Sequence, residues 1–202
     1  MSEQPESNTT TIAAYGYAIA SALERRDIDP SDVFSRAGVH LSSKTDPMVR
    51  LGSAEISRLF ALAVEETRDP AFGLFVGDCL HPGNLHALGY ALMSSDSLRD
   101  YCNRLVNYYR LISMGAGIRV EETDSDLLLI TEVMSDVCHE TQDAFVALHV
   151  RIMRFIYKPN FNPAWLNLKR PVPECGSQPY DNYFNCQISF SESQIVIAID
   201  RT

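Results

Sequence analysis

The sequence predicts an α+β fold: a helical N-terminal half followed by a small, mostly antiparallel sheet packed on a long helix. Apolar residues recur at helical spacing from residue 12 to about residue 113, and the alternation typical of strands begins only after that point. The longest helical pattern of the chain lies between the strand patterns. Helices and strands are therefore grouped rather than alternating, which indicates α+β and not α/β architecture.

Three helices are expected in the first third of the chain. Residues 12–23 carry an apolar stripe at helical spacing, and residues 29–38 begin with an Asp-Pro cap and end at a glycine. Residues 44–52 are expected to form a connector. A serine then caps a strongly amphipathic helix over residues 53–67.

Three further helical segments complete the N-terminal half. Residues 71–77 form a short and almost wholly apolar segment, and residues 81–84, with the sequence HPGN, predict a turn. Residues 85–95 are expected to be a buried helical segment. Ser97 resembles the first residue of a capping box and opens a helix that extends to about residue 112.

The second half contains the strands. Two alternating segments around a TDSD turn predict a β-hairpin at residues 117–133. The longest helix is expected over residues 136–157, followed by a strand at 164–170 and a helical turn at 180–185. Residues 188–200 are expected to form a closing strand pair around a short turn.

The length of 202 residues, 46% of them hydrophobic, is sufficient for one well-buried core. We expect a disordered polar tail at residues 1–10 and a single regulatory domain over residues 11–202. A division into a helical subdomain (11–113) and an α+β subdomain (114–202) is the alternative. Because the chain stops just after a strand, we also expect it to be a fragment of a longer protein.

The charge balance argues against DNA binding by this chain alone. Seventeen basic residues stand against twenty-six acidic ones, giving a net charge of -9, whereas proteins that bind a phosphate backbone usually carry a basic patch. We find no apolar run that could cross a bilayer and no secretory signal. The five cysteines include no CxxC pair, which favours free thiols in a reducing cytoplasm.

Three stretches in the correct order resemble the arabinose-binding-type N-terminal domain of AraC/XylS transcription regulators. The central one is TRDPAFGLFVGDCLHPGNLHALGYALMSSDSLRDYCNRLVNYYRLIS at 67–113, similar to the family patterns "DP.FGL..G" and "PG..G.LGYAL.SS". The others are the lead-in at 41–59 and the closing segment that begins AWLNLKRPVPE at 164. His86 departs from the family, because it stands where the pattern has a glycine.

The resemblance implies the effector-binding domain of a bacterial transcription factor. Such a domain binds a small metabolite and controls DNA binding by two C-terminal helix-turn-helix units, which this chain lacks. DNA would therefore be contacted only through the missing part. The alternative is a dimerisation or protein-interaction module without a small-molecule ligand, forming a homodimer through apolar segments such as residues 71–77.

Sequence signatures of catalysis are absent. The chain has no GxSxG nucleophile elbow, no GxxxxGKS phosphate loop and no GxGxxG. The zinc-protease pattern HExxH begins at His139 but has Asp143 in place of its second histidine. Three ligand-type side chains match no common zinc spacing: Cys79, His81 and His86. We therefore expect no enzyme, no catalytic residue, no metal and no cofactor.

Six residues are candidates for contact with a ligand: His149, Tyr90, Arg110, Phe145, Met153 and Trp165. His149 lies on an apolar face of the long helix, so it is either a core histidine with an internal hydrogen bond, the commoner case, or a polar group lining a cavity. Arg110 is either a solvated charge or an anchor for a ligand carboxylate. Trp165 is more often a core residue than a ligand platform.

The identity of the effector follows only weakly from the sequence. The net negative charge favours a cationic or zwitterionic effector such as an amino acid or an amine, because the overall field attracts positive species. A fatty or aromatic effector is the alternative.

Overall fold

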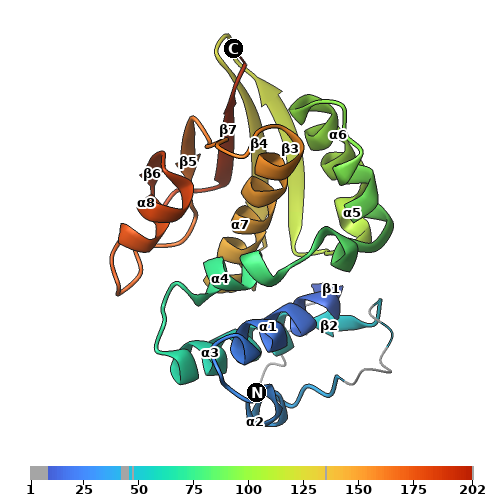
Figure 1. Cartoon of the computed structure of the whole chain (residues 1–202), viewed down its shortest axis with the longest axis vertical. Coiled ribbons are helices and arrows are strands. Elements are labelled where there is room, and N and C mark those ends of the chain that lie inside the picture. The colour runs from blue at the N-terminus through green and yellow to red at the C-terminus, as the bar shows by residue number, and fades with distance from the viewer. Residues whose placement is uncertain (1–8, 42–45, 47, 135, 202) are drawn as a thin grey trace, which may run out of the picture.

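The computed structural model describes residues 9–41, 46, 48–134 and 136–201 and confirms the α+β class (Figure 1). Most helices precede the main sheet along the chain, as predicted. The helices are α1 (Ala14–Glu24), α2 (Pro30–Ala37), α3 (Ser53–Thr67), α4 (Phe72–Cys79), α5 (His86–Met93), α6 (Leu98–Tyr108), α7 (His139–Ile156) and α8 (Gln178–Phe184). Two short 3-10 helices follow α4 and α6: Pro82–Leu85 and Tyr109–Leu111.

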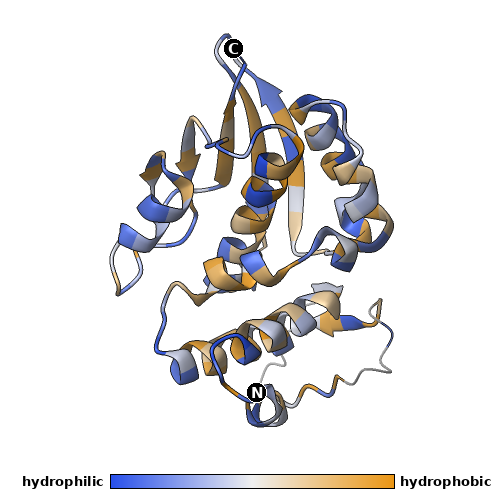
Figure 2. Cartoon of the chain, viewed as in Figure 1, coloured by the Kyte–Doolittle hydropathy of each residue, from blue (hydrophilic) through white to orange (hydrophobic). Residues whose placement is uncertain are grey.

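The main sheet has five strands in the order β3-β4-β7-β5-β6. Its members are β3 (Ala116–Glu122), β4 (Asp126–Val133), β5 (Trp165–Asn167), β6 (Gln187–Ser189) and β7 (Ile195–Asp200). All neighbours are antiparallel except β5 and β6, so the sheet is mostly antiparallel, as expected. The long helix α7 lies across this sheet, and the strands behind it are largely hydrophobic (Figures 1 and 2).

Two of the predicted helix caps are confirmed, whereas the predicted cap at Ser53 is wrong: Gly52 precedes α3, and its amide donates to the Glu55 carboxylate. The Asp29 carboxylate accepts a hydrogen bond from the Ser31 amide at 2.9 Å, and Gly38 ends α2 in the left-handed conformation. Ser97 accepts from the Asp100 amide at 3.1 Å at the start of α6. These local contacts satisfy backbone groups that a helix end leaves without partners.

Helix α4 packs against α7 through two glycines. A Cβ atom at Gly73 would lie 2.5 Å from the Glu140 carbonyl oxygen, and one at Gly77 would lie 2.5 Å from the Ala147 Cβ. Glycine therefore permits the two helix backbones to approach closely. This explains why the apolar 71–77 segment is buried despite its shortness.

A second, two-stranded sheet was not predicted. Strand β1 (Thr10–Ile12) pairs with β2 (Arg50–Gly52), so part of the expected connector at 44–52 is a strand. Thr9 is buried and Thr10 belongs to β1, although both were expected in the polar tail. The rest of that tail, residues 1–8, and residues 42–45 of the chain lie outside the described residues. Pairing across forty residues leaves no local periodicity, which is why the sequence pattern missed it.

His86, the residue that replaces the family glycine, begins α5 with an unusual backbone. Its φ is +51° and its ψ is −132°, a region that side chains disfavour and glycine adopts freely. Its Nε2 atom is also buried without a hydrogen-bond partner among the described residues. The glycine of the family pattern matches this conformation, and the histidine is strained in it.

We predict that His86→Gly stabilises the protein by about 1 kcal/mol, because it removes both the backbone strain and the unpaired ring nitrogen. Urea unfolding monitored by circular dichroism measures the change. Asn185→Gly is the control: Asn185 also has a positive φ, +49°, but lies in the left-handed region that asparagine tolerates, so its effect should stay within about 0.5 kcal/mol. Equal effects of the two substitutions would contradict the assignment of strain to His86.

Candidate functional site

A cavity of about 40 Å³, partly open to solvent, lies where the two sheets meet the start of α7. Its walls come from β1, the first turns of α3 and α7, and the ends of β3, β4 and β7. Six side chains form its apolar and aromatic wall: Ile56, Tyr109, Val133, Val137, Phe145 and Ile195. The remaining lining is rich in hydroxyl groups, three of them from consecutive threonines of the N-terminal segment, residues 9–11.

Most polar side chains of the cavity already have partners. The Thr9 and Ser53 hydroxyls both donate to the Asp136 carboxylate, at 3.2 Å and 2.5 Å. Thr11 donates to the Ile112 carbonyl at 3.3 Å, and Thr10 accepts from Arg50 at 3.0 Å. The hydroxyls of residues 57, 109, 113 and 141 are also hydrogen-bonded. These contacts stabilise the walls, and the protons that Thr9, Thr11 and Ser53 donate are not available to a ligand without rearrangement.

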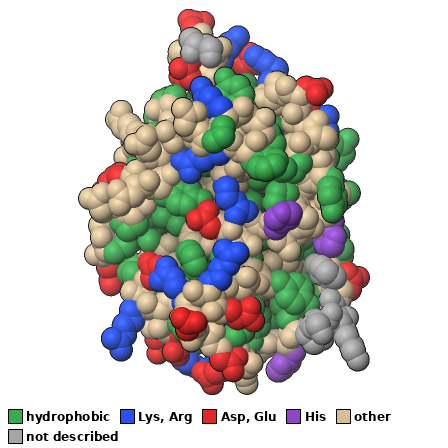
Figure 3. Space-filling view, viewed as in Figure 1, with side chains coloured by type: hydrophobic (Ala, Val, Ile, Leu, Met, Phe, Trp, Pro, Cys, Tyr) green, Lys and Arg blue, Asp and Glu red, His purple; other side chains and the backbone are tan. Residues whose placement is uncertain are grey.

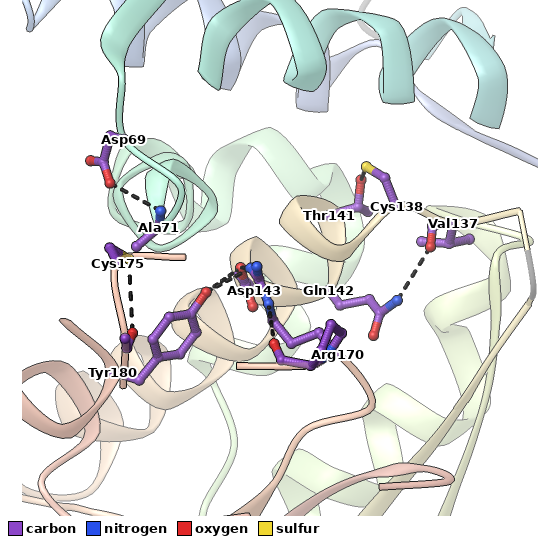
Figure 4. Close-up of polar contacts among 12 residues, drawn as sticks. Asp69, Ala71, Val137, Cys138, Thr141, Gln142, Asp143, Arg170, Cys175 and Tyr180 are labelled. Atoms are coloured by element: carbon purple, nitrogen blue, oxygen red, sulfur yellow. Dashed lines mark hydrogen bonds and ion pairs between the residues drawn. The ribbon is translucent and has the colours of Figure 1, made fainter. Parts of the chain in front are cut away.

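Two buried atoms of the cavity lining have no partner among the described residues: Thr131 Oγ1 and Gln142 Oε1. Thr131 is 1% exposed and Gln142 is 6% exposed. The Gln142 Nε2 donates to the Val137 carbonyl at 3.2 Å, which fixes the orientation of the amide because a carbonyl can only accept (Figure 4). A buried polar group without a partner costs about 1–3 kcal/mol, so two in one cavity indicate a place for another molecule.

The described residues that line the cavity include no Lys, Arg, Asp, Glu or His. Two lining residues, Thr9 and Ser53, donate hydrogen bonds to the carboxylate of Asp136, which is not itself part of the lining. Two aromatic rings of the wall, Tyr109 and Phe145, meet edge to face with centroids 5.5 Å apart. The cavity is therefore neutral, mainly apolar, and carries two free polar atoms.

A family model described as "Arabinose-binding domain of AraC transcription regulator, N-term" matches residues 28–202. The chain belongs to this family. The crystal structure of the transcriptional regulator CdpR from Pseudomonas aeruginosa has the same fold, with a TM-score of 0.63 at 15% identity. The match covers 92% of this chain and 54% of that one, so the AraC-type domain described here spans about half of the CdpR chain. No curated protein matches the sequence.

Of the six residues predicted to contact a ligand in this AraC-type domain, Phe145 lines the cavity. His149 is fully buried one turn further along α7, where it hydrogen-bonds with the Tyr101 hydroxyl and packs on Phe145. Met153 is buried in the core. The other three lie elsewhere: Tyr90 and Arg110 are exposed, and Trp165 is half-buried on β5. The structure does not bring these five to the cavity, and their role in binding stays a prediction.

Thr131 and Gln142 were not among the residues predicted from the sequence to contact a ligand. Gln142 lies three residues before Phe145 on α7, so a polar residue on the buried face was a detectable signal. Thr131 interrupts the apolar run of β4, but a threonine is common in a strand. The threonines of β1 were assigned to the tail and could not have been found without the strand pairing.

A second polar cluster lies on the other side of α7. Asp143 is buried, and the Arg170 guanidinium and the Tyr180 hydroxyl both donate to its Oδ2 atom (Figure 4). Burial raises the pKa of Asp143 to about 7, against the opposing effect of Arg170. This cluster joins α7 to α8 and to the segment before it, and the second oxygen of Asp143, Oδ1, is buried without a partner among the described residues. Across the part of the chain that the structure describes, no three His, Cys, Asp or Glu side chains are placed to hold a metal ion.

The surface shows no single dominant charge on the face in Figure 3, where basic and acidic side chains are interspersed. A shallow groove of about 580 Å³ runs between α5 and α6. Two exposed apolar side chains, Tyr108 and Leu111, line it. None of the described helices is both long and apolar enough to span a bilayer.

We predict that Thr131→Val leaves the stability of the ligand-free domain unchanged or raises it by up to about 1 kcal/mol, because the lost hydroxyl has no partner. Thr9→Val is the matched control in the same cavity. It should lower the free energy of unfolding by about 1 kcal/mol, since its hydroxyl is bonded to Asp136. Chemical denaturation measures both. A clear loss of stability in Thr131→Val would show that its hydroxyl is satisfied in the free domain.

His149 predicts a pH dependence of stability. Burial lowers its pKa from 6.5 to about 3, so the folded state keeps the ring neutral while the unfolded state binds a proton below pH 6.5. The stability that the neutral His149 ring contributes to the folded state is fully present above pH 6.5, and it declines as the pH falls towards 3. Lowering the pH from 7.5 to 5 should therefore reduce the free energy of unfolding by about 2 kcal/mol through this group.

We expect His149→Gln to remove most of that pH-dependent loss, whatever its effect at neutral pH. Denaturation curves at several pH values measure it, and His40→Gln, on an exposed position, is the control. An unchanged slope of stability against pH in His149→Gln would contradict a neutral buried ring.

Proposed function

We propose that this domain is the sensor of an AraC-type transcription factor, and that a small-molecule effector binds in the cavity at the start of α7. The observation that carries the proposal is the pair of buried unpaired atoms, Thr131 Oγ1 and Gln142 Oε1, in an otherwise satisfied cavity. A mainly apolar cavity with a few convergent polar groups is the usual form of a small-molecule site.

The similarity to known proteins supports a ligand-binding regulatory domain and does not specify the effector. The family description names arabinose binding. CdpR is described as a transcriptional regulator, and the match covers 54% of the CdpR chain. We infer that the effector controls DNA binding by a C-terminal helix-turn-helix domain outside this chain. We further propose a non-enzymatic role in the cytoplasm, in which all five cysteines remain free thiols.

Effector binding acts on the relative arrangement of the segments that form the walls of the cavity. Its walls come from β1, α3, the main sheet and α7, which are far apart in the sequence. A ligand that contacts Gln142 on α7 and Thr131 on β4 would favour one arrangement of these elements over another. Because one continuous core extends from α1 to β7, we propose that residues 11–202 respond as a single domain.

A thermal-shift screen of metabolites tests the proposal. A ligand at a hundredfold its dissociation constant should add about 2.7 kcal/mol of stability. Ala116→Val, which adds volume to the cavity lining, should abolish the shift. Gly117→Val is the matched control on the adjacent residue of the same strand, where an added Cβ meets nothing within 4 Å. A screen without any stabiliser, or hits that stabilise both variants equally, would refute binding in this cavity.

The second candidate function is dimerisation. The exposed apolar side chains at the α5–α6 groove favour it, since Tyr108 is 50% and Leu111 is 58% exposed. Sedimentation velocity over a range of concentrations tests it. A dimer that Leu111→Asp dissociates would support an interface there, and a monomer at high concentration would exclude it.

A further inference from the structure

We propose that the effector of this cavity is an uncharged molecule with an apolar body and one end group that both donates and accepts hydrogen bonds, such as a primary amide or a hydroxyl. This inference rests on the proposed function and specifies its ligand class. It differs from the amino acid or amine suggested by the net charge of the chain.

The need for a donor on the ligand comes from Gln142. Its Nε2 is committed to the Val137 carbonyl, so the atom left free is the carbonyl oxygen Oε1, which can only accept (Figure 4). A ligand group without a proton to donate, such as a carboxylate, would place two acceptors against each other. That contact is repulsive in a buried site.

The need for an acceptor on the ligand comes from Thr131, and from the hydrogen bonds that the other hydroxyls of the lining already make. Its hydroxyl can donate as well as accept, and no described residue takes its proton. The other hydroxyls of the lining are engaged, as with Thr9 and Ser53 on Asp136. One end group that presents a donor to Gln142 and an acceptor to Thr131 satisfies both free atoms at once.

The lining also disfavours a charge on the ligand. No Lys or Arg among its described residues could neutralise an anion. A cation would have to take Asp136 from Thr9 and Ser53, leaving two hydroxyls without their acceptor. Transfer of an uncompensated charge into such a site is much more costly than transfer of a neutral polar group.

The walls limit the number of polar groups on the ligand. Val133, Val137 and Ile195 offer no hydrogen bonds, and Phe145 presents a ring. Each further hydroxyl of a polyol would lose its water without replacement here. A cavity of about 40 Å³ holds a small end group, and the apolar body would extend towards the opening.

Four compounds with the same branched carbon skeleton and different end groups test the inference: isobutyramide, isobutanol, isobutyrate and isobutylamine. Each is titrated at pH 7 into the 15N-labelled domain. We expect the amide and the alcohol to shift the backbone amide signal of Thr131 and the side-chain amide signal of Gln142. The anion and the cation should leave both signals unchanged at equal concentration.

Two substitutions assign the binding to the free atoms. Thr131→Val and Gln142→Met should each weaken isobutyramide binding about tenfold, and Thr9→Val, which alters a committed hydroxyl, should have a smaller effect. Thr131→Val keeps the test valid if Gln142→Met fails to fold, because it removes only an unpaired hydroxyl.

The outcomes separate this inference from the proposed function. Isobutylamine or isobutyrate binding at the same signals as tightly as isobutyramide would overturn the ligand class and leave a sensor site in place. No shift with any of the four compounds would also overturn the ligand class, while the metabolite screen with Ala116→Val decides the proposed function independently.

Discussion

The burial of the central part of α7, residues 142–150, on every side is the constraint on which the rest of the structure depends. Helix α4 covers one side, where Gly73 and Gly77 let the two helix backbones approach closely, and the main sheet covers another. All residues from 142 to 150 are buried as a result. A helix in this position can carry polar side chains only where a neighbouring element supplies a partner, since an unpaired buried group costs about as much as several good contacts contribute.

The three polar side chains in this buried stretch meet the constraint differently. Asp143 is held by Arg170 and Tyr180, and His149 by Tyr101, so each links α7 to another part of the chain. Gln142 is only half satisfied, because its amide nitrogen has a partner and its oxygen has none among the described residues. Asp143 also has one oxygen, Oδ1, that is buried without a partner among the described residues, but only the free oxygen of Gln142 belongs to a residue that lines the cavity. Its place in the cavity lining is the reason why we propose Gln142, and not Asp143, as a contact of the ligand.

The parts of the structure that depend on local chemistry were predictable from the sequence. The cap at Asp29 and the long apolar face of α7 are encoded within one or two turns, and the fold class followed from their order. The β1–β2 pair was not predictable, because neither strand of three residues has a pattern of its own. The inward direction of His149 could be predicted, but its partner Tyr101 lies on α6 and is known only from the packing. Similarly, Thr131 is ordinary in a strand, and it becomes informative only once the packing shows that its buried hydroxyl has no hydrogen-bond partner among the described residues.

The same distinction between long-range and local chemistry explains why net charge is a poor guide to the effector. A charge of -9 spread over the surface acts through solvent, where salt screens it within about 8 Å at physiological ionic strength. It influences how a charged ligand approaches the domain, not what a buried cavity retains. Retention depends on the atoms within contact distance, and in the proposed site these are an acceptor on Gln142, a hydroxyl on Thr131 and apolar walls. Desolvation of a charge in such a cavity outweighs the weak attraction of the distant surface field, so the local lining determines the ligand class.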